Sequence, residues 1–68
     1  MEIRINGTMS TVAADSTVAD VVHSLGVDED TSGVAVAVND SVLPKRDWAA
    51  RRLAAGDAVE VIRAVQGG

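Results

Sequence analysis

The sequence predicts a small α+β domain in which one main helix packs on one face of a mixed sheet of four to five strands. Three features of the sequence support this prediction: an alternating segment with a tight turn opens the chain, residues 18–25 carry apolar side chains at helical spacing, and apolar segments follow at 34–38 and 58–62. With 68 residues, of which 47% are hydrophobic, the chain has enough apolar material for one core and one domain.

The first residues predict a hairpin. The first strand alternates polar and apolar side chains, so Ile3 and Ile5 are expected to face the core. Asn6 and Gly7 form a strong turn signal, because both residues tolerate the positive φ of a type I′ turn. The returning strand is expected over about residues 8–13, where poor alternation leaves its register open.

The main helix is predicted to begin after Thr17, which suits the N-cap and can form a capping box with Asp20. Gly26 suits the position just past its end. One apolar face, expected to pack on the sheet, consists of Val18, Val21, Val22 and Leu25. Leu25→Ala is therefore expected to cost about 2–5 kcal/mol. His23 falls on the opposite side and is interpreted as a surface histidine.

Residues 34–38 are apolar without interruption, which predicts a strand at the centre of the sheet that is covered on both faces or nearly so. Because a helix separates it from the hairpin, we expect this strand to lie parallel to one of the first two strands through a right-handed crossover. The core side of the sheet is expected to include Val36 and Val38 from this strand and Val59 and Val61 from the last one.

The remaining elements are short. An edge strand is expected over 41–43 and is ended by Pro44. The next residues, 45–48, suit a single helical turn, and Trp48 is expected in or beside the core. A Gly-Asp turn at 56–57 leads into the last strand. This order of hairpin, helix, strand, short strand and strand is that of a β-grasp.

Composition excludes several classes of function. The net charge of −4 argues against nucleic acid as a partner, because binding it requires a basic face. The sequence has no cysteine, no metal-ligand spacing and no glycine-rich phosphate loop. No apolar segment approaches the roughly 20 residues that a membrane span needs. We therefore predict no catalytic residue, no metal site and no bound cofactor, and expect the protein in the cytoplasm.

The end of the chain carries its most distinctive chemistry. We divide the sequence into a domain, residues 1–64, and a flexible tail, residues 65–68. Gly68 would offer an α-carboxylate that is ionised at neutral pH. Gly67 and Gln66 would lead it through a narrow channel in another protein, since glycine adds no side chain and much freedom in φ. A frayed end without function is the alternative interpretation.

Two surface regions are candidates for docking a partner. Ile62 and Ala37 are expected on the exposed face of the sheet, because they alternate with the core residues of their strands. An apolar patch there would suit another protein. Arg51 and Arg52 are a second candidate, although a solvated pair is the more common outcome for adjacent arginines.

Several local signals occur together in an order that matches a known family. They are the strand opening at Met1, the Asn6-Gly7 turn, the Thr17-Val18 helix start, Asn39, Pro44, Trp48, Gly56-Asp57 and the final Gly67-Gly68. Over the whole chain the sequence thereby resembles the ThiS-type sulfur carriers of thiamine biosynthesis, which are ubiquitin-like β-grasp proteins. The resemblance implies a protein co-substrate rather than an enzyme.

The resemblance also implies partners. An E1-like enzyme would adenylate Gly68 with ATP, a cysteine-derived persulfide would supply sulfur for a thiocarboxylate, and thiazole synthase would receive that sulfur. The same features leave alternatives open: a sulfur carrier for molybdopterin or cysteine synthesis, a ubiquitin-like modifier joined to lysines, or a plain interaction domain.

Overall fold

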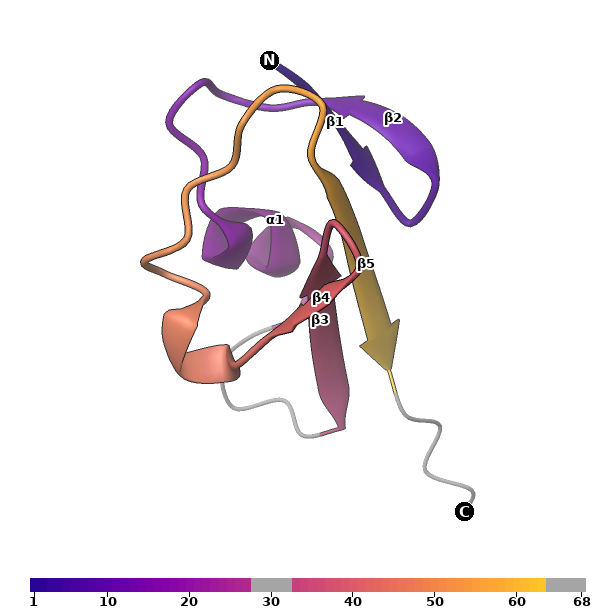
Figure 1. The fold of residues 1–68 in the computed structure, drawn as a ribbon, viewed down its shortest axis with the longest axis vertical. Helices are drawn as coiled ribbons and strands as arrows, with labels where there is room; N and C mark the ends of the chain where they lie inside the picture. The colour runs from indigo at the N-terminus through magenta and orange to yellow at the C-terminus, as the bar shows by residue number, and fades with distance from the viewer. Residues whose placement is uncertain (28–32, 64–68) are drawn as a thin grey trace.

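The computed structural model describes residues 1–27 and 33–63 of the 68-residue chain. Seven elements lie in these residues (Figure 1): β1 (Glu2–Ile5), β2 (Thr8–Thr11), α1 (Val18–Ser24), β3 (Val34–Val38), β4 (Ser41–Leu43), the 3-10 turn η1 (Lys45–Asp47) and β5 (Ala58–Arg63). The order of elements is the predicted one, and the return strand β2 ends two residues earlier than expected.

The five strands form one mixed sheet in the order β2-β1-β5-β3-β4. β1 and β5 are parallel, and the other neighbouring pairs are antiparallel. The helix α1 lies between this sheet and the segment that joins η1 to β5 (Figure 1). Backbone bonds from Val18 to Arg51 and from Ala19 to Trp48 attach that segment to the first turn of α1. One helix on one face of a mixed sheet confirms the predicted architecture.

The expected position and covering of β3 were wrong. β3 pairs with β5 and β4, both antiparallel, and the strand parallel to β1 is β5. The last strand fills the gap between the hairpin and β3, so β5 is the central strand of the sheet. Val36 and Val38 are buried beneath α1, whereas Ala35 is exposed and Ala37 is half-buried. One helix covers one face only, and the residues of β3 on the other face are small alanines.

Local signals placed the helix correctly. The Thr17 hydroxyl oxygen accepts a hydrogen bond from the Asp20 backbone N–H at 3.2 Å, and the Asp20 carboxylate accepts one from the Thr17 N–H at 2.9 Å. These two bonds are the predicted capping box. At the other end Gly26 has φ +80°, and the Val27 N–H donates to the Val22 carbonyl. This Schellman motif ends the helix where the glycine predicted.

The prediction that Leu25 packs in the core was wrong. Leu25 is the C-cap of α1, with φ −89° and ψ 6°, and its side chain is 37% exposed. The helix that would align it with Val18 ends at Ser24, and Leu25 is not among the residues that form the core or pack against it. Val27, which is 2% exposed, is buried in the core after the turn. The cost of Leu25→Ala therefore falls below the range expected for a fully buried leucine.

The core lies between α1 and one face of the sheet. Its buried members are Ile3, Val18, Ala19, Val21, Val22, Val27, Val36, Val38, Trp48, Leu53 and Val59. Ile5 and Val61, both expected in the core, are half-buried and pack against it. Trp48 is 2% exposed, and its indole Nε1–H donates to the Leu43 carbonyl at 3.1 Å, so the prediction for Trp48 is confirmed.

Candidate functional site at the open sheet face and the end of β5

The face of the sheet opposite α1 carries an apolar patch. Strand register places Ile62 beside Ala35 and Val42 beside Ala37. Ile62 is 57% exposed and Val42 is 76% exposed. We call Ala35, Ala37, Val42 and Ile62 the open-face patch. The structure thus brings the two predicted residues, Ala37 and Ile62, onto one open face, and their docking role stays a prediction.

Sequence reasoning missed two residues of this patch. Ala35 has the same phase as Ala37 along β3, and the second missed residue is Val42. It lies in β4, a strand of three residues, where the side-chain alternation is too short to assign faces. Its place follows only from its pairing with Ala37. In the sequence, Val42 and Leu43 are two adjacent apolar residues of one strand, so they must lie on opposite faces of the sheet. Which of the two faces the core can be decided only when the pairing partner in β3 is known.

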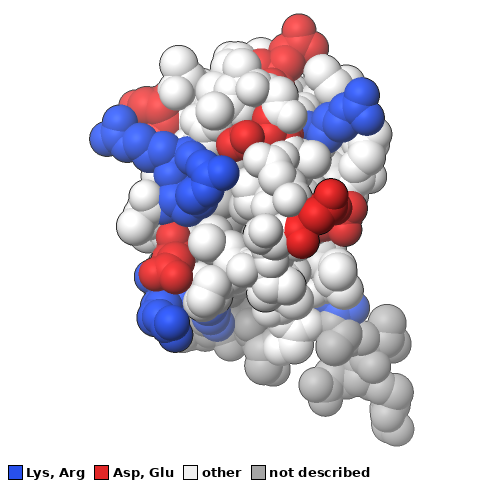
Figure 2. All heavy atoms as spheres, viewed as in Figure 1, with Lys and Arg blue, Asp and Glu red and all other residues white. Residues whose placement is uncertain are grey.

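Charge is unevenly distributed over this acidic protein. Four of its six lysine and arginine residues lie within residues 45–52, and most basic side chains occupy the left side of the molecule in Figure 2. Within this group Arg51 is engaged by its own chain: one guanidinium nitrogen donates to the Arg52 carbonyl, and another lies 3.6 Å from an Asp57 carboxylate oxygen. The Arg52 residue is exposed. A docking role for either arginine stays a prediction.

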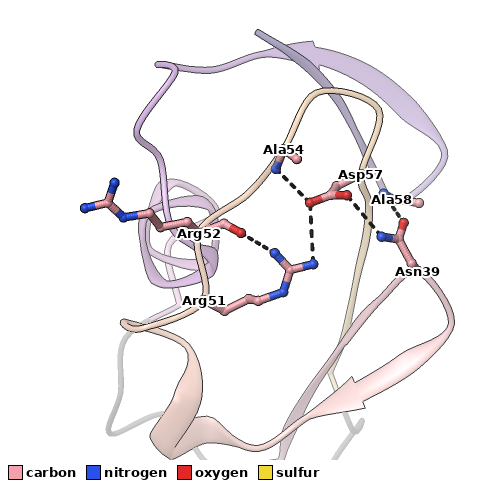
Figure 3. Close-up of polar contacts among 6 residues, drawn as sticks. All are labelled: Asn39, Arg51, Arg52, Ala54, Asp57 and Ala58. Carbon is pink, nitrogen blue, oxygen red and sulfur yellow. Dashed lines mark hydrogen bonds and ion pairs between the residues drawn. The ribbon is translucent and has the colours of Figure 1, made fainter.

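A polar cluster fixes the start of β5 (Figure 3). The Asp57 carboxylate accepts hydrogen bonds from the Ala54 backbone N–H at 2.8 Å and from the Asn39 side-chain amide at 3.0 Å. The Asn39 side-chain oxygen accepts from the Ala58 N–H at 2.9 Å, and the Asn39 N–H donates to the Ala58 carbonyl at 2.8 Å. The turn between β3 and β4 is thereby joined to the first residue of β5, which leads to the open-face patch.

These contacts predict how stability depends on pH. The Ala54 N–H, the Asn39 amide and the nearby Arg51 hold the pKa of Asp57 below its usual value of 3.8. A carboxyl whose pKa is lowered by folding stabilises the protein above 3.8, and this contribution is lost as the pH falls through the folded-state pKa. Asp57→Asn should therefore cost about 1–3 kcal/mol at pH 7 and progressively less below pH 3.8.

Urea denaturation of both proteins between pH 7 and pH 2 measures this difference. Asp15→Asn is the matched control, since it removes an exposed carboxylate of the same type. A gap between wild type and Asp57→Asn that stays constant over the whole range would contradict the assignment.

The predicted tail residues Gln66, Gly67 and Gly68 lie outside the described residues. The structure does describe where the strand before them ends. Arg63, the last residue of β5, donates from its guanidinium to the Leu25 carbonyl at 2.7 Å. A cation at this position also interacts favourably with the C-terminal end of α1. The end of β5 is therefore held against the end of the helix.

The remaining predictions from the sequence concern His23, a metal site and a membrane span. His23 is exposed on α1, as predicted. Residues 1–27 and 33–63 contain no group of three or more His, Cys, Asp or Glu side chains placed to hold a metal ion. In the same residues, no helix combines the length and the apolar character needed to cross a bilayer.

Comparison with known proteins gives consistent matches. The profile of the ThiS family matches residues 3–68. The sulfur carrier protein ThiS of Escherichia coli (strain K12) is 29% identical over 68 residues, which is all of both chains. The crystal structure of the thiamine biosynthesis protein ThiS from Geobacter metallireducens has a TM-score of 0.80 and 33% identity, covering 100% of both chains. SAMP1 from Haloferax volcanii has a TM-score of 0.61 at 21% identity, covering 98% of this chain and 97% of its own.

The likeness to SAMP1 concerns the fold alone, and it agrees with the β-grasp predicted from the order of elements. The likeness to ThiS extends to the sequence. It begins at the first buried residue of β1 and continues to Gly68. With the family profile matched from Ile3 to the final glycine, and with a ThiS structure superposing over its full length, this chain belongs to the ThiS family.

Proposed function

We propose that this protein carries sulfur for the formation of the thiazole of thiamine, as a thiocarboxylate on Gly68. The observation that carries the proposal is the match to the ThiS family, which includes the final two glycines. The Escherichia coli relative is named a sulfur carrier protein, and the Geobacter metallireducens structure is named a thiamine biosynthesis protein; each is matched over its full length.

The proposed chemistry starts from an unreactive group. A carboxylate is a poor acyl donor, so an E1-like enzyme first joins the Gly68 carboxylate to the α-phosphate of ATP, and pyrophosphate leaves. The terminal sulfur of a cysteine-derived persulfide then attacks the acyl carbon, and AMP leaves with the electrons of the C–O bond. A thiol reduces the resulting acyl disulfide, which releases the thiocarboxylate. Thiazole synthase is the proposed acceptor of its sulfur.

In this scheme the chain is a co-substrate and binds no cofactor of its own; ATP belongs to the activating enzyme. Five residues follow β5, and a fully extended chain of that length spans at most about 16–18 Å. Two glycines offer little surface for recognition, so the folded body must supply the binding energy that positions the carboxylate. The proposed partners are the activating enzyme and thiazole synthase, and the proposed location is the cytoplasm.

The open-face patch is the surface that we assign to docking. Ala35, Val42 and Ile62 are exposed and Ala37 is half-buried, with the exposed Glu60 beside Ala37 on the same face. Ile62 is the residue before the last described position of β5. Apolar side chains at the centre of an interface carry much of its binding energy. A partner that covers this face would also hold the end of β5 near its own active site.

The direct test uses the activating enzyme of a ThiS pathway with ATP and labelled pyrophosphate. The protein should be required for pyrophosphate–ATP exchange, and with a sulfur donor and a thiol it should release AMP in step with a gain of sulfur on Gly68. Conjugates of the protein with lysines of other proteins, without sulfur transfer, would instead indicate a ubiquitin-like modifier. Absence of exchange with every activating enzyme tried would contradict the proposal.

Ile62→Asp should raise the KM for this protein in the exchange reaction at least about tenfold and change kcat little, because it places an unpaired charge in an apolar interface. The fold should be unaffected, since the side chain is 57% exposed. His23→Ala is the matched control: His23 is exposed on α1, across the sheet from the patch, and its loss should leave both constants within about threefold of wild type. Equal effects of the two changes would remove the open-face patch from the docking surface.

A further inference from the structure

β5 changes from a central strand to an edge strand along its length. Its antiparallel pairing with β3 continues to Arg63, which lies opposite Val34. Its parallel pairing with β1 ends earlier, where Ile5 lies opposite Val59. The hairpin turns away at this point, and in Figure 1 the lower half of β5 continues past it. Beyond Val59, β5 is therefore flanked by a strand on one side only.

Asn6 marks the end of the paired part. Its backbone N–H donates to the Val59 carbonyl at 2.9 Å, and its side-chain oxygen accepts from the Val61 N–H at 2.8 Å. Hydrogen-bonding groups alternate between the two edges of a strand, so the next groups on this edge are the Val61 carbonyl and the Arg63 N–H. Neither has a hydrogen-bond partner among the described residues. The edge thus offers one acceptor followed by one donor.

The side chains leave these backbone groups accessible. The guanidinium of Arg63 reaches the Leu25 carbonyl at the end of α1, on the helix side of the sheet. Ile62 is on the opposite, open face and is 57% exposed. Proteins usually protect a sheet edge with proline, lysine or a bulge, because an unpaired edge is a template for another strand. Residues 61–63 contain no proline or lysine, and β5 is in regular register with β3 there.

We propose that an extended segment of the activating enzyme pairs with β5 along this edge, accepting from the Arg63 N–H and donating to the Val61 carbonyl. The inference rests on the proposed function. We assign the edge to the activating enzyme because the chain that follows Arg63 ends in Gly68, the residue that this enzyme would adenylate. Pairing of this kind recognises backbone, and it fixes the direction of the strand. Fixing the direction of the last described residues of β5 would orient the carboxylate toward the nucleotide.

Arg63→Pro tests the pairing with little disturbance of the fold. The Arg63 N–H points away from β3, so proline removes the donor offered to the partner and no bond within the sheet. Proline is tolerated at such edge positions, and the extended conformation that it requires of the preceding residue is that of a strand. Arg63→Ala is the matched control, because it removes the same side chain, with its bond to Leu25, and keeps the N–H.

We expect kcat/KM for pyrophosphate exchange to fall at least about tenfold from Arg63→Ala to Arg63→Pro, because both variants lack the arginine side chain and only the proline variant lacks the N–H. Equal values of kcat/KM for the two variants would overturn the proposal, whether both are as active as wild type or both are impaired. If the wild-type protein supports no exchange, the proposed function is contradicted. If wild type is active and the two variants have equal kcat/KM, only the pairing along β5 is contradicted.

A second measurement on the wild-type protein is independent of the folding of the proline variant. Hydrogen exchange of the Arg63 amide, followed by NMR, should slow at least about tenfold when the activating enzyme binds. Exchange of the Glu60 amide should change little, because Glu60 is already paired with Ala37 in β3. An Arg63 amide that exchanges as fast in the complex as in the free protein would overturn the proposal. Protection by thiazole synthase alone would overturn the choice of the activating enzyme as occupant.

Discussion

Adding one alanine after Gly68 should abolish activation while leaving the fold and docking unchanged. The extra residue converts the Gly68 carboxylate into an amide and moves the free carboxylate about 3.3–3.6 Å along the chain. It also places a Cβ beside the reacting carbon, where the natural chain has none. A displacement of about 1 Å can already cost a factor of 100 in rate, so pyrophosphate exchange should fall by at least that factor.

The extended protein should still compete with wild type for the activating enzyme, with an inhibition constant close to the KM of wild type. That competition is the control for docking, since the open-face patch and β5 are unchanged. Exchange at the normal rate by the extended protein, with sulfur on its new final residue, would show that activation does not require the free carboxylate to be that of Gly68.

Trp48→Ala should destabilise the domain by about 3–5 kcal/mol. Trp48 is 2% exposed, and the change leaves a cavity in the core and removes the donor to the Leu43 carbonyl. Small domains have a total stability near the lower end of about 5–15 kcal/mol, so much of the variant should be unfolded at 37 °C. Urea denaturation followed by circular dichroism measures the difference.

Met9→Ala is the control for this change. Met9 is also a large apolar residue, but it is 52% exposed, and its loss should cost no more than about 0.5 kcal/mol. A urea midpoint for Trp48→Ala equal to that of wild type would show that the tryptophan is not part of the core.

The elements of the fold could be predicted where the signals are local. The capping box of Thr17 and Asp20 and the positive φ of Gly26 each involve neighbouring residues, and both are as predicted. The end of the apolar face was harder to place, because Leu25 keeps the helical spacing in sequence after the backbone has left the helix. The composition of β3 did not predict its position in the sheet. Its valines face the core and its alanines face the open side, but because both residue types are apolar, the sequence does not show that one face is uncovered.

The candidate site shows the same division. Ile62 and Ala37 were placed on the open face by alternation along single strands, which the sequence displays. Val42 joins them through a pairing between strands, and the edge of β5 depends on a bond from Asn6 to Val61, 55 residues apart. These contacts depend on the order of strands in the sheet, in which the last strand, β5, lies between β1 and β3.

The central claim is that Gly68 carries sulfur, and the intact mass of the protein purified from its own cells tests it most directly. The proposed function predicts a population heavier than the unmodified chain by the mass difference between sulfur and oxygen, with the added mass located by fragmentation on the final glycine. The heavier population should increase when the cells must make their own thiamine. A protein found only as the free carboxylate under those conditions, or only joined to lysines of other proteins, would contradict the claim.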